Sequence, residues 1–292
     1  MSFSYRDETK ELNELTRREA SGAFVQLSDG FTHYELSNLG AQETVVLVHG
    51  FSVPYFIFDP TFEFLTQSGF RVVRYDLFGR GFSDRPDTRY NIDLFVRQLG
   101  DLLDALHIRR PVSLAGLSTG GPITAAFTAR FAERVSKLIL IDPVGARPFA
   151  LSRILKVAAM PLVGETIVGL LGNAGVARRI AASSVTPENI GEFGERYLVQ
   201  MQYKGFRRAI LSTIRCRMLD SFLEVYERIG KMKKPVLLLW GRNDTTVPFH
   251  HSAILRAAMP EVEFHAIENS GHIPHYEKPE EVNPILFDFL KR

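Results

Sequence analysis

Short apolar runs that alternate with helical stretches constrain the fold of this chain most strongly. The runs are "FVQL", "THYEL", "TVVLVHG", "FRVVRYD", "PVSLAG", "KLILIDP", "PVLLLWG" and "VEFHAI". Uninterrupted valine, isoleucine and leucine indicate strands that are buried on both faces, as in a parallel sheet covered by helices. Residues 59–68, 92–107 and 119–134 have helical patterns between these runs. The sequence therefore predicts repeated strand–helix–strand units of an α/β fold.

The alternation stops after Pro143 and resumes at residue 235. Residues 147–230 have helical patterns without a convincing strand, so we expect a helical cap inserted into one α/β core of residues 22–146 and 231–292. A chain of 292 residues, 45% of them hydrophobic, is long enough for such a core.

The N-terminal extension, residues 1–21, is more polar than the core. Mixed charges over residues 6–20, with Leu12 and Leu15 one turn apart, predict a solvated or docked helix. The first residues lack an apolar signal segment, and Cys216 is the single cysteine, so we expect no internal disulfide and a cytoplasmic location.

Charge and hydropathy exclude several classes of partner. The chain has 35 Lys and Arg against 33 Asp and Glu, so no strong field for nucleic acid is expected. Residues 154–177 are apolar and long enough to span a bilayer, but Lys156, Pro161, Glu165 and Asn173 interrupt them. We therefore expect no transmembrane segment, and contact of the cap with a lipid surface stays open. The oligomeric state does not follow from the sequence.

Ser118 stands where an apolar strand run changes into a helical pattern, in "GLSTGG". The spacing of Gly116, Ser118 and Gly120 matches G-x-S-x-G, in which a sharp strand-to-helix turn exposes the serine hydroxyl. We expect Ser118 to be a nucleophile. A glycine-rich loop with an idle serine is the alternative.

A serine nucleophile needs a histidine base, and the base needs an acid to orient it. His272 lies in a loop after the last apolar run and is our candidate base, with His275 as its rival. Asp244 and Asp142 both follow strand runs, at the sheet edge where the carboxyl ends of parallel strands meet. Either carboxylate is therefore a candidate acid.

The run "VLVHGFS" supplies a candidate for the oxyanion site. Its strand ends at His49 and Gly50, so the backbone N–H of Phe51 is expected to face that of Thr119, the residue after the nucleophile.

These motifs resemble those of the serine α/β-hydrolases over residues 22–292, the cap excepted. The resemblance rests on "HGF", "YDLFGRGFSDRP", "GLSTGG", "GRNDTTVP" and "GHIPHYEKP". It implies a mostly parallel sheet of about eight strands with the second antiparallel, helices on both faces, a helical cap and no cofactor. The order Ser118, Asp244, His272 along the chain is that of this family and favours Asp244 as the acid. Within the family, the chain looks most similar to carboxylesterases and monoacylglycerol lipases.

We expect a small-molecule carboxylic ester as the substrate. The apolar cap residues and "FSVPYFIF" near the oxyanion donor predict an apolar pocket that prefers medium acyl chains. Cleavage of a C–C bond or perhydrolysis by the same triad is one alternative, and a ligand sensor on the same fold is another.

Cofactor and metal sites are not expected. "FGRGFSD" follows a strand run, but Asp84 replaces the third glycine of a dinucleotide fingerprint, and we expect Asp84 to hold its own turn. The adjacent His250 and His251 point in different directions at the start of a helix and do not form a metal site.

Overall fold

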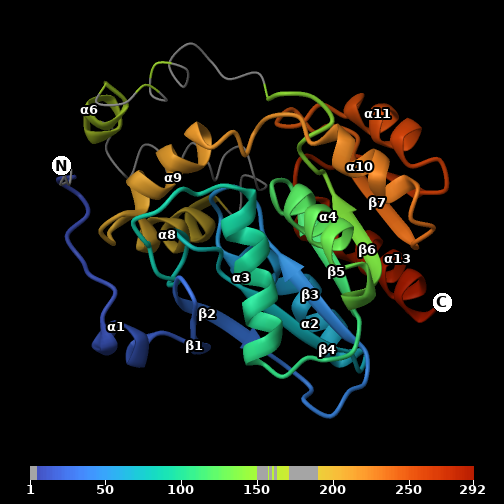
Figure 1. The fold of residues 1–292 in the computed structure, drawn as a ribbon, viewed down its shortest axis with the longest axis horizontal. Helices are drawn as coiled ribbons and strands as arrows, with labels where there is room; N and C mark the ends of the chain where they lie inside the picture. Colours follow the sequence, from blue (N-terminus) through green and yellow to red (C-terminus); the bar gives the residue numbers. More distant parts are fainter. Residues whose placement is uncertain (1–4, 150–156, 158–159, 161–162, 171–189) are drawn as a thin grey trace.

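A computed structural model describes residues 5–149, 157, 160, 163–170 and 190–292 (Figure 1). The described strands are β1 (Ala23–Leu27), β2 (Gly30–Leu36), β3 (Thr44–Val48), β4 (Arg71–Tyr75), β5 (Val112–Leu117), β6 (Val135–Ile141), β7 (Val236–Gly241) and β8 (Glu263–Ile267). The described helices are α1 (Glu14–Glu19), α2 (Asp59–Gln67), α3 (Ile92–Ala105), α4 (Gly120–Arg130), α6 (Val163–Leu170), α8 (Ile190–Met201), α9 (Phe206–Arg215), α10 (Leu223–Gly230), α11 (His251–Ala258), α12 (Pro274–Glu277) and α13 (Pro279–Lys291), with short 3₁₀ helices η1 (Tyr55–Phe58) and η2 (Ala132–Arg134).

The strands form one eight-stranded sheet in the order β1-β2-β4-β3-β5-β6-β7-β8. Strand β2 pairs antiparallel with β1 and β4, and all pairs from β4 to β8 are parallel. This arrangement confirms the predicted mostly parallel sheet with an antiparallel second strand. Because β5, β6, β7 and β8 are consecutive neighbours, the loops that follow them leave the sheet side by side.

The sheet is buried on both faces. Successive residues of β3 alternate between two apolar clusters: Val46 and Val48 pack with residues of α3, α4 and α10, whereas Val45 and Leu47 pack with residues of η1, α2 and α13. This is why the strands have uninterrupted apolar sequences and no polar alternation.

Helices α6, α8 and α9 form a group apart from the helices that flank the sheet (Figure 1). They belong to the predicted cap of residues 147–230. Helix α10, which was expected in the cap, instead packs on α4: the Tyr226 side chain is fully buried and its hydroxyl donates to Val144 O at 2.8 Å. The core therefore resumes before residue 231. Part of the apolar segment 154–177 lies outside the described residues.

The N-terminal extension differs from the helix predicted over residues 6–20. Its helix α1 begins only after Asn13, whose side chain accepts from Thr16 N. The residues before Asn13 contact the cap, because the carboxylate of Glu8 accepts the N–H groups of Gly205 and Arg207, both at 2.7 Å. Satisfying two free N–H groups at the start of α9 competes with helix formation in this segment.

None of the helices within the described ranges combines the length and apolar character that a bilayer-spanning segment requires.

Candidate active site

Ser118 lies on a tight turn between β5 and α4, as the sequence predicted. Its φ is +53°, a left-handed conformation that is uncommon for a residue with a side chain. The turn is held by Ser118 N, which donates to Ile141 O at 2.9 Å, and by Val144 N, which donates to Ser118 O at 3.1 Å. The last residue of β6 and the loop that follows it thus fix the serine at the carboxyl end of the sheet.

The glycines around Ser118 are required by close backbone approach. A Cβ on Gly116 would lie 2.4 Å from Gly120 O, and one on Gly120 would lie 2.2 Å from Val48 O. A Cβ on Gly121 would lie 2.5 Å from Pro143 Cβ. The pattern that singled out Ser118 in the sequence is therefore a steric requirement of this turn.

The loop after β3 passes beside Ser118, because a Cβ on Gly50 would lie 3.1 Å from Ser118 Cβ. Within the described part of the chain, neither the N–H of Phe51 nor that of Thr119 has a hydrogen-bond acceptor. Two unpaired backbone donors beside a serine are what an oxyanion site requires. The structure therefore places both predicted donor residues at the ends of segments that meet at Ser118.

His49 orients the peptide that carries the Phe51 N–H. The His49 ring lies 2.9 Å from Gly50 O through Nδ1, and Nε2 accepts from Leu77 N at 2.9 Å. Burial lowers the pKa of His49 to about 4, so the ring is neutral and Nδ1 carries the proton. A hydrogen bond to Gly50 O polarises the same peptide and strengthens Phe51 N–H as a donor.

His272 and Asp244 lie together in loops after β8 and β7. His272 Nδ1 is 2.7 Å from Asp244 Oδ2, and the other carboxylate oxygen accepts Thr246 N at 2.7 Å and Val247 N at 2.9 Å. The Asp244 side chain is fully buried, whereas 13% of the His272 side chain is exposed. The carboxylate is thus fixed by backbone donors and fixes the ring in turn. The Ser118 hydroxyl forms no hydrogen bond with another described residue.

Asp142, the rival acid, is fully buried at the end of β6 with a φ of +42°. One carboxylate oxygen accepts Gly241 N at 2.9 Å, and the other has no partner among the described residues. Side-chain atoms of Asp142, Asp244 and His272 lie within 4.8 Å of one another. Burial, and then the charge of Asp244, raise the pKa of Asp142 well above its ordinary value. Asp142 therefore lies beside the His272–Asp244 pair, held by Gly241 N.

His275, the rival base, is part of the core. Its ring is fully buried against Phe58, and Nε2 donates to Ile57 O at 3.1 Å. Burial lowers its pKa to about 3, so the ring is neutral at physiological pH. The structure does not bring His275 to Asp244.

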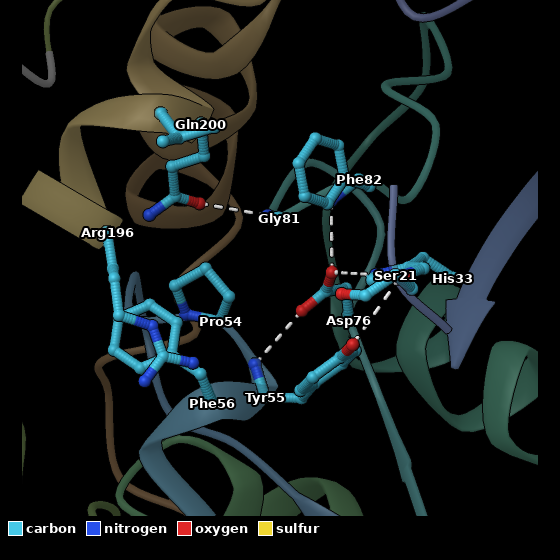
Figure 2. Close-up of a pocket in the computed structure, with 11 residues that line it drawn as sticks. Ser21, His33, Pro54, Tyr55, Phe56, Asp76, Gly81, Phe82, Arg196 and Gln200 are labelled. Atoms are coloured by element: carbon cyan, nitrogen blue, oxygen red, sulfur yellow. Dashed lines mark hydrogen bonds and ion pairs between the residues drawn. The ribbon is translucent and has the colours of Figure 1, made fainter. Parts of the chain in front are cut away.

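A cavity of about 210 Å³ lies between η1, α8 and the loop after β4, and no member of the predicted triad lines it (Figure 2). Its floor is a buried pair in which His33 Nδ1 is 2.7 Å from Asp76 Oδ2. Asp76 also accepts the N–H groups of Tyr55 and Phe82, both at 2.9 Å. Burial acts to raise the pKa of Asp76, but the hydrogen bond from His33 and its charge outweigh burial and lower it. This pair fastens β2 and β4 to the loops of the cavity.

Two predictions about individual loops need correction. In "FSVPYFIF", Pro54, Tyr55 and Phe56 line the cavity of about 210 Å³, which no member of the predicted triad lines, whereas Ile57 and Phe58 are buried in the core between β3, α2 and α13. Asp84 does not hold its own turn with its carboxylate, which instead accepts Phe31 N at 2.8 Å and pairs with Arg17 at 2.7 Å.

The match to a family model extends over residues 45–285, and its description is the alpha/beta hydrolase family. The chain belongs to this family.

Relatives of near-full-length coverage include a 2-hydroxy-6-oxononadienedioate/2-hydroxy-6-oxononatrienedioate hydrolase of Paraburkholderia phymatum. It is 29% identical over 290 residues, which cover 93% of this chain and 96% of the relative. An uncharacterized protein of Mycobacterium bovis is 26% identical over 275 residues, covering 86% of this chain and 76% of that protein.

Solved structures share the fold. A meta-cleavage product hydrolase from Pseudomonas fluorescens matches with a TM-score of 0.77 at 23% identity, covering 92% of this chain and 97% of the other. A thermophilic esterase from Thermogutta terrifontis matches with a TM-score of 0.75 at 22% identity, covering 93% and 98%.

Proposed function

We propose that this chain is a hydrolase in which Ser118 attacks a substrate carbonyl, His272 is the general base and Asp244 orients His272. The observation that carries the proposal is the buried His272–Asp244 hydrogen bond of 2.7 Å at the sheet edge where Ser118 occupies a positive-φ turn. A serine on a strained turn, a histidine fixed by a carboxylate and two free backbone donors are the parts that acyl transfer requires.

The proposed reaction has two stages, acylation of Ser118 and hydrolysis of the acyl-enzyme. Ser118 Oγ forms a bond to the carbonyl carbon as its proton passes to His272. The carbonyl oxygen becomes negatively charged, and the N–H groups of Phe51 and Thr119 donate hydrogen bonds to it. The leaving group departs and takes the proton from His272. Water then adds to the acyl-enzyme and gives one proton to His272. The bond between Ser118 Oγ and the acyl carbon breaks as His272 returns this proton to Ser118, and the acid is released.

For the bond that is cleaved, we propose the C–C bond next to the ketone of a 2-hydroxy-6-oxo-dienoate. Support comes from the relatives named as hydrolases of such compounds, because the identity of 28–29% extends over more than nine-tenths of both chains. In the 2-keto tautomer of such a substrate, formed when the 2-hydroxyl loses its proton and the carbon next to the ketone gains one, that carbon is conjugated through a double bond to the new 2-carbonyl. Its charge is therefore delocalised onto the 2-carbonyl oxygen as the bond breaks. The same triad then suffices for a carbon leaving group.

Ester hydrolysis is the second candidate. The esterase from Thermogutta terrifontis supports only the fold. Of the run expected to form an apolar acyl pocket, Pro54, Tyr55 and Phe56 line a cavity, but no member of the predicted triad does. The triad itself is equally suited to esters.

The deciding experiment compares kcat/KM for a 2-hydroxy-6-oxo-dienoate with kcat/KM for p-nitrophenyl butyrate, with Ser118→Ala as the control. A preference for the dienoate of about 10² or more, with loss of both activities in S118A, is expected because a site built for one leaving group discriminates strongly. Preference for the ester would establish the second candidate. Activity that survives in S118A would overturn the proposal.

A further inference from the structure

We propose that the cap controls the oxyanion site through two positioning residues, Arg80 and Gln200, which hold the loop that carries the Phe51 N–H. This inference rests on the proposed function, because it assigns a catalytic purpose to the geometry of that loop.

Three successive carbonyl groups of the loop are each held by a side chain. Gly50 O accepts from His49 Nδ1 at 2.9 Å, Phe51 O from Arg80 Nε at 2.8 Å, and Ser52 O from Gln200 Nε2 at 2.9 Å. Binding consecutive carbonyls fixes the peptide planes between them, and therefore the direction of the Phe51 N–H. Only the first of these contacts comes from the loop itself.

Arg80 connects the loop to cap helix α9. Its Nη2 donates to Thr213 Oγ1 at 2.8 Å, and Nη1 donates to Phe78 O at 3.1 Å. The side chain is fully buried, and it forms no ion pair with any carboxylate of the described residues. Burial lowers its pKa to about 10, so the guanidinium remains charged at neutral pH. A buried cation without a counter-charge depends on these neutral acceptors and on the surrounding aromatic rings.

Gln200, on cap helix α8, uses both ends of its amide. Nε2 donates to Ser52 O, and Oε1 accepts Gly81 N at 2.9 Å, the contact drawn in Figure 2. The two bonds define the orientation of the amide. Gln200 therefore connects the loop that carries the Phe51 N–H to the loop that carries Arg80.

The cap is packed closely against the same loop. A Cβ on Gly79 would lie 2.5 Å from Ala209 Cβ on α9, so no side chain fits between them. A shift of α8 or α9 is thus transmitted to Arg80, Gln200 and the carbonyls of Phe51 and Ser52. Because an oxyanion donor acts only within a narrow distance of the developing charge, such a shift changes kcat.

The test uses Thr213→Val, which keeps the shape of the side chain and removes the acceptor of Arg80. Thr213→Ser restores the hydroxyl. Thr128→Val is the matched control, because Thr128 is also fully buried and donates to the carbonyl four residues earlier, at Thr124 O, as Thr213 does to Ala209 O. Gln200→Met tests the second contact independently.

Three quantities are measured for each variant: kcat and KM on the better of the two substrates above, and the affinity for phenyl trifluoromethyl ketone. The ketone carbon bonds to Ser118 Oγ, the serine proton passes to His272, and the carbonyl oxygen becomes an oxyanion. Its affinity therefore reports the oxyanion site, whereas KM reports largely the ground state.

We expect T213V and Q200M to lose about tenfold in both kcat and ketone affinity with little change in KM, less than the 10²–10³ lost when a whole donor is removed. T213S should recover most of the loss, and T128V should lose stability alone. Equal kinetics in T213V, Q200M and wild type would overturn the inference, as would an equal kcat loss in T128V. A wild-type protein that neither turns over a substrate nor binds the ketone would instead overturn the proposed function.

Discussion

His272 Nδ1 lies 2.7 Å from Asp244 Oδ2, whereas Asp142, the other buried carboxyl group nearby, has one oxygen without a partner among the described residues. We therefore expect Asp244→Asn to lower kcat by about 10⁴, the loss that the analogous change causes in a serine protease. Asp142→Asn should cost far less, because the His272 ring is held by Asp244 and the amide oxygen of asparagine can still accept Gly241 N. Steady-state kinetics of both variants at pH 7.5 check this. A larger loss from D142N would move the acid to Asp142.

Two glycine substitutions, one at the Ser118 turn and one within α3, should have opposite effects on stability. In Gly120→Ala the new Cβ would lie 2.2 Å from Val48 O, so β3 or α4 must shift and the free energy of unfolding should fall by more than 2 kcal/mol, as for other strained core changes. In Gly100→Ala, within α3, the new Cβ meets only Phe127 at 3.6 Å, so alanine should stabilise the helix by about 0.5–1 kcal/mol. Urea unfolding measures both, and a tolerated G120A would contradict the geometry of the turn.

Two buried histidines predict loss of stability in mild acid. The pKa of His49 is about 4 and that of His275 about 3, against 6.5 in the unfolded chain. Because folding lowers both pKa values, each histidine contributes its full stabilisation above pH 6.5. As the pH falls this contribution is lost, so that the free energy of unfolding decreases by about 2 kcal/mol per histidine at pH 5.

His275→Gln isolates one of these contributions, since glutamine can still donate to Ile57 O. The free energy of unfolding of H275Q should fall about 2 kcal/mol less than that of wild type between pH 7.5 and pH 5. Burial acts to lower the pKa of His33, but Asp76 outweighs burial and raises it. His33 therefore changes stability in the opposite direction, and because wild type and H275Q share it, its contribution cancels in the comparison. Parallel pH profiles for wild type and H275Q would show that His275 is not held neutral.

The apolar cap predicts a preference among esters if the second candidate function holds. Each acyl methylene that enters an apolar pocket is stabilised by up to about 0.8 kcal/mol, so octanoate should exceed butyrate by up to roughly 10² in kcat/KM. Measuring acetate, butyrate, octanoate and palmitate esters of p-nitrophenol checks this. A maximum at acetate with a steep fall beyond butyrate would indicate a small closed pocket.

Local patterns in the sequence were sufficient for the sheet and for the turn at Ser118, but they left Asp244 and Asp142 open as the acid, and the choice between them rested on the order of the residues along the chain. The apolar runs report burial on both faces, and the glycines report the close approach at the turn. Contacts between distant segments left no such pattern. Arg80 and Thr213 are 133 residues apart, and "FGRGFSD" gives no sign that its arginine reaches the cap.

The misplaced boundaries have the same origin. Helix α10 has the amphipathic pattern of a cap helix, and only Tyr226 packing beneath α4 assigns it to the core. The early end of the N-terminal helix depends on Glu8 reaching Gly205, a contact made only after the chain has folded.

The central claim is that Ser118 is the nucleophile. Treatment with a p-nitrophenyl alkylphosphonate, followed by intact-mass and peptide mass spectrometry, tests it most directly. The account predicts one phosphonyl group per chain, attached to Ser118, with p-nitrophenol released in equal amount, and no adduct in S118A. An adduct on another residue, or a Ser118 that stays unmodified while the enzyme is inactivated, would contradict it.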